Sequence, residues 1–506
     1  MSLGLLSRVE PSDRRLILFL ALGLSAFVPF FEEIHSANEL SRLYLAQAIV
    51  QDGTVSIDGP LKRLGNIHDK AERDGHQYSD KAPGIAFLAV PVVWAHGQLA
   101  KDGPTLRNEV RLARFVASTL PTLMLLLLLA GFLAEHVPRR GVRHLLLVGY
   151  AFGSLATTYG ILLFGHQLSA VLLFSAYLVI RRIDPTSRRW PVALAAALMS
   201  FAVVVEYQNV LLAAPLAVAL GLALWRRPTL FAWALLGTLP FALALLSYHQ
   251  AAFGSPWKTG YSFLTSEFKA VHAQGFMGIG RPRIEHATLS FLSAKKGLLF
   301  YSPFLLLAVP GLALLRGRDG WLHAVMIAGL SLFVCAMIYP VGGWTVGQRH
   351  LTVLVPWLLL PAGLAMTRAP WLVGGLGGLV LAGVLATGLS TIVWPHFQEQ
   401  LENPFHQVAW PLYLKGYLPP SAFGVVGLSS WTVTLLLAAG TVGLVAVAVW
   451  RESRAWARAV HLALVVGLPV AWFLGTRPIG RAQDVRFDVA WIEKVYEPDP
   501  LRPPRR

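Results

Sequence analysis

The chain has 506 residues, of which 55% are hydrophobic and 14% are charged. An average soluble domain carries about 25% charged residues, so this chain lacks the polar surface of a water-soluble protein. Apolar runs recur from end to end, which excludes a globular domain with a single anchor. A single cysteine, Cys335, excludes a disulfide scaffold. The composition therefore predicts an all-α integral membrane protein.

The formal net charge of +16 comes from 43 Lys and Arg against 27 Asp and Glu. Lys and Arg of membrane proteins collect in cytoplasmic loops, where they set orientation and meet anionic lipid. Nucleic-acid binding is disfavoured because no basic region stands apart from the apolar segments. The first apolar stretch, 16–31, lacks a small-residue cleavage site, so no cleavable signal peptide is expected.

Spanning helices need about 20 apolar residues each, and about thirteen segments approach that length. They are 16–31, 115–134, 143–163, 166–181, 190–205, 208–225, 229–248, 298–315, 321–339, 350–367, 371–394, 428–450 and 456–475. The stretch 84–99 is interrupted by Pro91, His96 and Gln98, so it is predicted to lie at the membrane interface.

The basic turns give the chain an orientation. If 84–99 does not cross, all of them fall on one side, which the positive-inside rule makes cytoplasmic. The N-terminus is then cytoplasmic, and the tail 476–506 follows a transmembrane domain, 1–475, on the outer face. The long polar segments also emerge on that face, where loops of such length usually carry function. These segments are 32–99, 249–297, 340–349 and 395–427.

The first outer loop carries the densest set of ionisable side chains. Residues 37–50 have the apolar spacing of an amphipathic helix on the membrane surface. Charged groups at a membrane boundary can be solvated anchors, but so many in one loop favour a single working site. They include Glu32, Glu33, His35, Glu39, Arg42, Asp58, Lys70, Asp80 and Lys81.

Two strings in this loop resemble a known family. The first is Asn38-Glu39-x-x-Arg42, and the second is Asp74-Gly75-His76-Gln77-Tyr78-Ser79-Asp80-Lys81-Ala82-Pro83. They resemble the first periplasmic loop of GT-C glycosyltransferases that use polyprenyl-phosphate sugars, namely the protein O-mannosyltransferases and the lipid A aminoarabinose transferases. Gly75, Tyr78, Lys81 and Pro83 match the closing string of that loop, with Ala82 in place of its first proline.

The resemblance covers roughly residues 1–210. It implies a GT-C-like bundle in a bacterial inner membrane, with juxtamembrane helices in the first periplasmic loop and a periplasmic C-terminus. It also implies sugar transfer from a polyprenyl-phosphate donor to a glycan, lipid or protein acceptor by direct displacement at the periplasmic face.

This chain departs from the family at the residue held to be the catalytic base. Asn38 stands in place of that aspartate, and His166 stands where a second family aspartate follows the third span. An amide cannot usefully accept a proton, so the base is expected at Glu39, then His166, then Glu33.

Stabilisation of the leaving phosphate requires cations. Lys81 is expected there from the family match, with Arg349 and Arg42 as further cations, since Arg can clamp two phosphate oxygens. Arg349 would alternatively anchor a lipid headgroup. Further substrate contacts are predicted for Asn38, Tyr78, Glu206, Tyr207, Tyr261 and Trp344. For the aromatic residues of this set an interfacial belt is the alternative, and for Glu206 a structural ion pair.

No cofactor and no dedicated metal site are predicted, because no metal-binding string is present, although His35, Glu39 and Asp58 would suit a divalent cation. A looser likeness to bacterial membrane proteins assigned to the same superfamily lies in three later strings. These are Phe253-Gly254-Ser255-Pro256, Lys296-Gly297-Leu298-Leu299-Phe300-Tyr301-Ser302-Pro303 and Gly342-Gly343-Trp344-x-x-Gly347-x-Arg349.

Two other functions remain open at this point. A transporter or scramblase of lipid-linked saccharides would need charged residues lining a path through the spans, and the predicted spans hold almost none. A transferase resembling the O-antigen ligases would centre its chemistry on Arg349 and His350.

Overall fold

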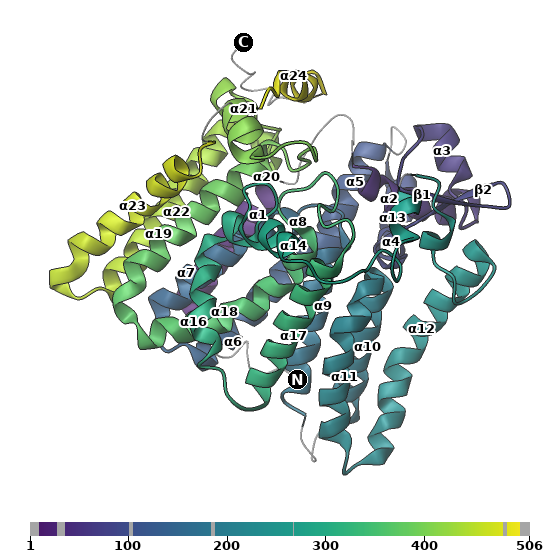
Figure 1. Ribbon diagram of the computed structural model, residues 1–506, viewed down its shortest axis with the longest axis horizontal. Helices are drawn as coiled ribbons and strands as arrows, with labels where there is room; N and C mark the ends of the chain where they lie inside the picture. The colour runs from purple at the N-terminus through teal and green to yellow at the C-terminus, as the bar shows by residue number, and fades with distance from the viewer. Residues whose placement is uncertain are drawn as a thin grey trace.

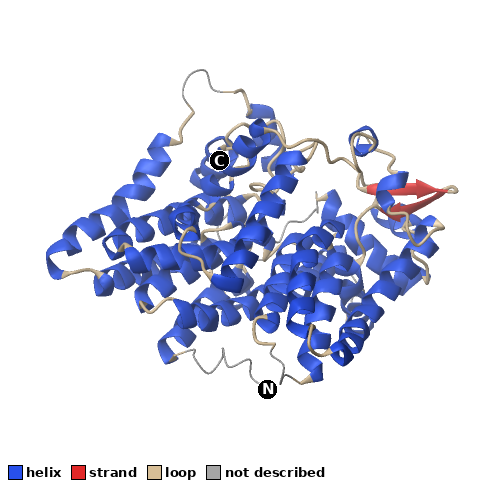
Figure 2. Ribbon diagram, turned by 60° about the horizontal axis from the view of Figure 1, so that its bottom comes forward, coloured by secondary structure: helices blue, strands red, loops and turns tan. Residues whose placement is uncertain are grey.

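The computed structural model describes residues 10–27, 36–100, 105–183, 188–266, 268–478 and 483–495. The molecule is built almost entirely of helices, with one small β-hairpin at its edge (Figure 2). The predicted all-α membrane fold is therefore confirmed.

The helices run in chain order through the arrangement in Figure 1. Those of the first half are α1 (Pro11–Ala26), α2 (Ala37–Gln47), α3 (Asp58–Leu64), α4 (Gly84–Leu99), α5 (Leu106–Arg114), α6 (Leu120–His136), α7 (Arg140–Phe152), α8 (Leu155–Tyr159), α9 (Gly165–Ile180), α10 (Arg189–Val205), α11 (Val210–Leu224) and α12 (Phe231–Phe253). Those of the second half are α13 (Phe268–His272), α14 (Ile284–Ala287), α15 (Leu298–Tyr301), α16 (Ala308–Leu312), α17 (Gly317–Ala336), α18 (Val355–Arg368), α19 (Val373–Gly383), α20 (Leu389–Val393), α21 (Trp410–Lys415), α22 (Ser430–Glu452), α23 (Arg458–Gly475) and α24 (Arg486–Val495).

Within the described residues, 8 helical stretches are long and apolar enough to cross a membrane. Four shorter apolar helices accompany them, so the predicted count of about thirteen spans is not confirmed. The eight are Leu106–His136, Tyr207–Leu224, Pro228–Phe253, Gly317–Ala336, Arg349–Arg368, Pro370–Val393, Ser430–Glu452 and Ala455–Gly475. The shorter ones are Gly84–Leu99, Gly165–Ile180, Arg189–Val205 and Pro303–Leu312.

Two predicted spans are broken, and both breaks have local causes. The segment 143–163 ends its first helix at Phe152, and the Ser154 side chain then caps α8 by accepting a hydrogen bond from the Ala156 N–H at 3.2 Å. The segment 298–315 is divided at Ser302 and Pro303, where proline cannot supply the backbone donor that a continuous helix needs.

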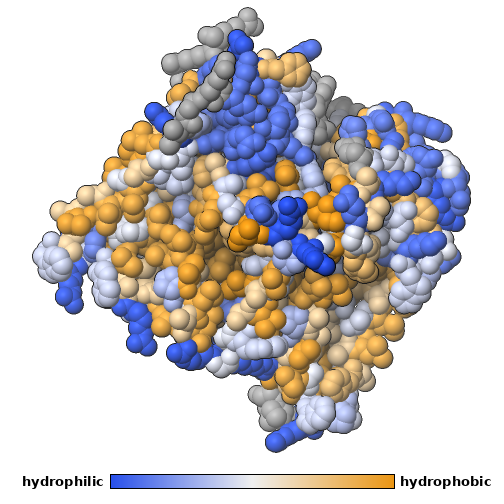
Figure 3. Space-filling view, in the orientation of Figure 1, coloured by the Kyte–Doolittle hydropathy of each residue, from blue (hydrophilic) through white to orange (hydrophobic). Residues whose placement is uncertain are grey.

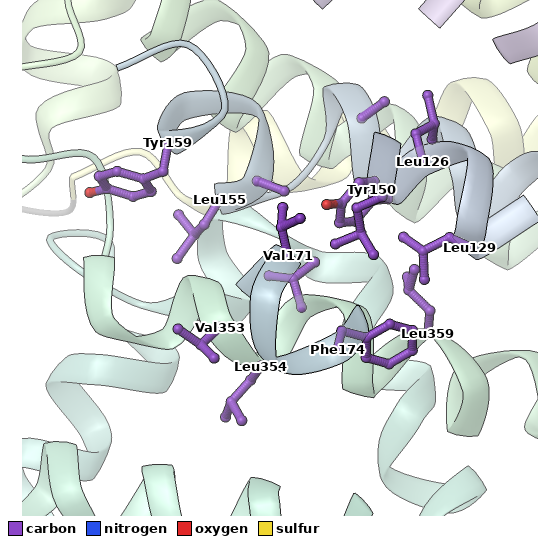
Figure 4. Packing of buried hydrophobic residues seen from close by; sticks show 14 of the residues in the cluster. Leu126, Leu129, Tyr150, Leu155, Tyr159, Val171, Phe174, Val353, Leu354 and Leu359 are labelled. Atoms are coloured by element: carbon purple, nitrogen blue, oxygen red, sulfur yellow. The ribbon is translucent and has the colours of Figure 1, made fainter. Parts of the chain in front are cut away.

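The helices at the centre of the bundle differ from those at its edge. In the stretch Arg349–Arg368, 89% of the most apolar window is buried, against 6% in Pro228–Phe253, so α12 presents an apolar surface to its surroundings. Buried side chains of α6, α7, α8, α9 and α18 interlock at the centre, as Figure 4 shows for Leu129, Tyr150, Phe174 and Leu359.

Glycine allows helices to make close backbone contacts in the core. A Cβ on Gly383 of α19 would lie 2.5 Å from the carbonyl oxygen of Gly153, at the end of α7. Real Cβ atoms do not approach that closely, so only glycine permits these backbones to touch.

Ion pairs join several basic turns at one end of the bundle. Arg181, at the end of α9, pairs with Glu135 of α6 at 2.6 Å and with Asp319 of α17 at 3.1 Å. Arg143 of α7 pairs with Glu10, just before α1, at 3.1 Å. These turns therefore share one face of the molecule, as their basic character predicts.

The first loop and α24 lie toward the opposite end of the molecule (Figure 1). Figure 3 shows hydrophobic side chains across the middle of this view, with hydrophilic ones over the regions of α21 and α24 and over the first loop. This is the surface pattern of a protein that spans a membrane.

The helix predicted in residues 37–50 is present as α2, but it is not a surface helix. Asn38, Glu39, Ser41 and Arg42 are all buried, along with the apolar residues of the same helix. Polar side chains buried in this way need partners inside the protein, and those partners form the candidate site.

Candidate functional site

A β-hairpin places Lys81. Strands β1 (Lys70–Arg73) and β2 (His76–Ser79) are antiparallel and joined by Asp74 and Gly75, both with positive φ (52° and 80°). Two such residues give the tight turn that matches the twist of a hairpin. Tyr78 is buried with its ring 5.9 Å from that of Phe253, at the end of α12.

The Lys81 ammonium lies between two carboxylates. Its Nζ is 2.9 Å from Oδ2 of Asp69, which precedes β1, and 2.9 Å from Oδ2 of Asp80. The Ser41 hydroxyl of α2 donates to Asp80 at 3.4 Å and lies 2.8 Å from the Ser79 hydroxyl. The hairpin is thereby tied to α2.

These neighbours shift the titration of the cluster. Burial disfavours the charged ammonium, but Asp69 and Asp80 outweigh it and raise the pKa of Lys81. Burial likewise opposes ionisation of Asp69, yet Lys81, Arg349 and Arg42 together lower the pKa of that carboxyl. Burial and the nearby Asp69 charge raise the pKa of Asp80. Both Lys81 and Asp69 are therefore charged at neutral pH.

Arg42 is held in the same region. Its guanidinium donates to the Asn38 side-chain oxygen and to Oε1 of Glu206 at 2.5 Å. Glu206 follows α10, so this ion pair joins the first loop to the bundle. Only 1% of the Arg42 side chain is exposed, and a cation buried so deeply needs such a partner.

Glu39 is fully engaged. Arg114 of α5 grips both of its oxygens, with Nε to Oε1 at 2.7 Å and Nη2 to Oε2 at 2.7 Å. The Leu163 N–H donates to Oε1 at 2.7 Å, and His396 Nε2 lies 3.7 Å from Oε2. Burial opposes ionisation, but the Arg114 charge and hydrogen bonds prevail and lower the pKa of Glu39. A carboxylate paired in this way is a weak proton acceptor.

Arg349 has a different setting. It opens the 3₁₀ turn Arg349–Leu354 that leads into α18, and its guanidinium carbon lies 5.8 Å from the centre of the Phe164 ring. In the described part of the chain no carboxylate lies within ion-pair distance of it. Its charge nevertheless acts on Asp69, and it acts on Lys81 as well. Arg349 is therefore near enough to the Lys81 cluster to act on its charges, and among the described residues it has no acidic partner.

Beside Arg349 lie two buried histidines. The rings of His166, in the first turn of α9, and His350 are 4.7 Å apart and meet edge to face. In the described residues, the Nδ1 atoms of both rings are buried without a hydrogen-bond partner. Such groups are costly unless a ligand or water satisfies them.

Aromatic residues complete one side of the cluster. The Tyr207 hydroxyl is 2.9 Å from His249 Nε2, and its ring lies 5.9 Å from that of Tyr261. Tyr261 stacks on His272 with ring centres 4.5 Å apart. Burial, assisted by Glu206 and Asp80 against the opposing Lys81 charge, raises the pKa of Tyr261 to about 12. Trp344 lies apart from these rings, 41% exposed, against Trp491 of α24.

Most of the residues predicted for the site are brought together. Lys81, Arg42, Arg349, Glu206 and Tyr261 act on shared neighbours, whereas Trp344 is turned toward the C-terminal helix. The predicted base Glu33, together with Glu32 and His35, lies outside the described residues. No group of three or more His, Cys, Asp or Glu side chains within the described ranges could hold a metal ion.

Sequence reasoning missed Asp69 and Arg114. Asp69 belongs to no motif, and only its place before a hairpin signalled by Asp74-Gly75 could have pointed to it. Arg114 lies 75 residues beyond Glu39, so their pairing is a tertiary contact that no local sequence pattern predicts.

Comparison with known proteins establishes the class of fold. No family model and no curated protein sequence matches the chain. Among solved structures, the crystal structure of ArnT from Cupriavidus metallidurans in the apo state is similar, with a TM-score of 0.50 and 14% sequence identity over 97% of this chain and 90% of that one. The chain therefore has a GT-C-like membrane fold, as its first loop implied.

ArnT is a lipid A aminoarabinose transferase. The crystal structure of the same Cupriavidus metallidurans protein bound to undecaprenyl phosphate gives a TM-score of 0.47 at 13% identity, with 96% of this chain and 88% of that one covered.

Proposed function

We propose that this protein is a membrane glycosyltransferase that moves a sugar from a polyprenyl-phosphate donor to an acceptor at the periplasmic face of a bacterial inner membrane. The observation that carries the proposal is the gathering of Lys81, Arg42 and Arg349 around Asp69, at the end of the bundle opposite the basic turns. Arg349 and Lys81 suit a phosphate group, with the paired Arg42 adding positive charge beside them, and Lys81 stands at the position of the family's phosphate-binding lysine.

The reaction is a displacement at the anomeric carbon. The acceptor oxygen forms a bond to that carbon, and the bond from the carbon to the phosphate oxygen breaks with its electron pair remaining on the phosphate. Arg349 and Lys81 stabilise the charge that grows there. The isoprenoid tail stays in the hydrocarbon, where burial contributes about 0.8 kcal/mol per CH₂.

The acceptor proton requires a base, and the geometry reorders the sequence candidates. The Glu39 carboxylate is occupied by Arg114, which favours a structural role for it. We assign the base to Asp69. Its contact with Lys81 is made through Oδ2, and 14% of its side chain is exposed, whereas Glu39 is fully buried and both of its oxygens accept from Arg114. His166, whose buried Nδ1 has no partner in the described residues, is the second candidate.

The remaining predicted residues take supporting roles. Asn38 and Glu206 hold Arg42 in place through its two guanidinium contacts. Tyr207 and Tyr261 present aromatic faces beside the cluster, where sugar rings commonly stack.

Binding and transfer test the proposal in turn. The purified protein in lipid nanodiscs should bind radiolabelled undecaprenyl phosphate, and membranes containing it should consume a radiolabelled undecaprenyl-phosphate sugar. Lys81→Ala should abolish consumption while leaving membrane insertion intact. Binding and movement of the lipid across the bilayer without any sugar transfer would instead support the transporter or scramblase.

The predicted orientation is tested by reporter fusions. Alkaline phosphatase fused after Arg477 should be active if the C-terminus is periplasmic, and a fusion within the basic turn 226–227 should be inactive. The opposite pattern would place the site on the cytoplasmic side and remove the proposed donor and acceptor geometry.

A further inference from the structure

Two sequence strings, of which the proposed mechanism uses only Arg349, meet in the structure. Residues 296–303 include α15 with two residues on either side of it. Residues 342–349 lie in the connection between α17 and α18. About 50 residues separate them in sequence, yet the side chain of Lys296 reaches directly into the second string.

The Lys296 ammonium makes three hydrogen bonds to this loop. It donates to the carbonyl oxygens of Gly343 and Thr345, each at 2.9 Å, and to the Thr345 hydroxyl at 2.8 Å. The Lys296 backbone carbonyl accepts from the Gln348 N–H at 2.7 Å. One residue therefore binds both the middle and the end of the loop, immediately before Arg349.

The loop is shaped to receive this ammonium. Gly342, Gly343 and Gly347 have φ values of 71°, 84° and 62°, in the left-handed region that favours glycine. The loop carbonyl of Val346 also accepts from the Tyr159 hydroxyl at 2.8 Å. The backbone leading to Arg349 is thus held from two sides.

The energetic setting of Lys296 is unusual. Its side chain is 1% exposed, and no carboxylate in the described ranges lies within ion-pair distance of it. A buried ammonium without an acid is unfavourable, so the three oxygen acceptors must offset the lost hydration. Natural sequences rarely retain such a lysine where an apolar residue would pack as well.

We propose that Lys296 is a positioning residue that fixes residues 342–348 in the shape that presents Arg349 to the donor phosphate. The inference rests on the proposed function, because it assigns Arg349 to that phosphate. Lys296 itself does not touch the substrate. Its three donors are all committed to the loop.

This arrangement also makes the loop sensitive to pH. Burial, with further repulsion from Arg349 and Lys295 against a weaker attraction by Glu399, lowers the pKa of Lys296 to about 7. Lys296 is protonated and charged below that pH and becomes a neutral amine above it. Since a bound phosphate favours the charged form, the contribution of Lys296 to phosphate affinity should fall as pH rises through neutrality, and comparison with Lys296→Met separates it from the titration of the phosphate itself.

The test measures the affinity for undecaprenyl phosphate of wild type, Lys296→Met and Lys295→Met from about pH 6 to about pH 8.5. Lys296→Met should weaken binding at least about tenfold at the acid end and flatten the pH dependence. Lys295 is the matched control, because its ammonium pairs with the exposed Glu402 at 3.1 Å, and Lys295→Met should change the affinity by less than about twofold.

A milder variant covers the case in which Lys296→Met does not fold. Thr345→Val removes one acceptor and keeps the shape of the side chain, so it should weaken binding about threefold. If Lys296→Met binds undecaprenyl phosphate with the same affinity and the same pH profile as wild type, the inference is overturned and the proposed function still stands. A wild-type protein that does not bind undecaprenyl phosphate would overturn both.

Discussion

The two sides of the candidate site neutralise their cations in different ways. On the first-loop side Lys81 lies between Asp69 and Asp80, Arg42 pairs with Glu206, and Arg114 with Glu39. On the late-loop side, Arg349 and Lys296 have no carboxylate within ion-pair distance in the described part of the chain and rely on an aromatic ring and on backbone oxygens.

The difference separates two tasks that the same residue types can perform. Ion pairs with internal acids are complete before any ligand arrives, so they contribute to holding the loop on the bundle. Cations without acids keep their charge available for an incoming anion. The first-loop side therefore builds the site and holds Lys81 in it, and the late-loop side supplies most of the charge that a phosphate can still gain.

The largest effect is expected from Glu39→Gln. It removes the carboxylate charge that pairs with the buried Arg114, so the protein should lose about 3–5 kcal/mol of stability. Thermal unfolding in detergent measures this, with Glu72→Gln at the exposed edge of the hairpin as the control. Unchanged melting with complete loss of sugar transfer would instead make Glu39 the base that the sequence indicated.

Next in size is Arg349→Ala. The Arg349 guanidinium has no carboxylate partner in the described residues, so its removal should weaken undecaprenyl phosphate binding about a hundredfold. Arg349→Lys should weaken binding about tenfold, because a lysine cannot bind two phosphate oxygens at once. Arg283→Ala, at an exposed arginine just before α14, should have no effect. Equal affinities for all three variants would show that the late-loop side does not hold the phosphate.

A gain of affinity is expected on the first-loop side. Asp69→Asn removes one of the two carboxylates on Lys81, so undecaprenyl phosphate should bind about fivefold more tightly. The pKa of Asp69 is lowered from its usual value near 4, so the wild-type carboxylate stays ionised throughout the range from about pH 6 to about pH 8. The gain in affinity should therefore be constant over that range.

The same variant separates binding from chemistry. If Asp69 is the base, Asp69→Asn should lose sugar transfer while binding the lipid more tightly. Glu402→Gln, which removes the exposed partner of Lys295, serves as the control and should change neither lipid binding nor sugar transfer. Weaker lipid binding in Asp69→Asn would contradict the view that Lys81 is already neutralised.

The smallest effect is expected from Trp491→Ala. The Trp491 ring lies 5.7 Å from Trp344 and 6.1 Å from Trp394, and aromatic pairs contribute about 0.5–1.5 kcal/mol. Lipid affinity should fall about twofold to fourfold, as the loop before Arg349 loses part of its support. An effect as large as that of Arg349→Ala would mean that α24 belongs to the site itself.

The sequence predicted the fold class and the main cations, but it did not predict which groups neutralise each cation. Apolar length and basic turns indicate the bundle, and the string ending in Lys81 and Pro83 indicates the phosphate side. The helix at 37–50 was also predicted, but on the membrane surface. The helix is buried, with its Arg42 paired to Glu206. The two residues are 164 positions apart in sequence, and no local pattern encodes such a pairing.

The choice of base shows the same limit. Asn38 signalled that the family's aspartate is absent, and Glu39 was its natural replacement in sequence. The Arg114 pairing became visible only in three dimensions. Ionisable residues are identified by sequence, whereas their availability for chemistry depends on tertiary neighbours.

The contact between Trp344 and Trp491 has a practical consequence. Trp344 lies in the loop that Lys296 secures, and its indole meets one carried by the C-terminal helix. Indole emission responds to packing and solvent, so this pair is an intrinsic fluorescent reporter of loop position. The chain has 16 tryptophans, so the difference in emission between wild type and Trp491→Phe would give the signal of this pair and report ligand binding without an attached dye.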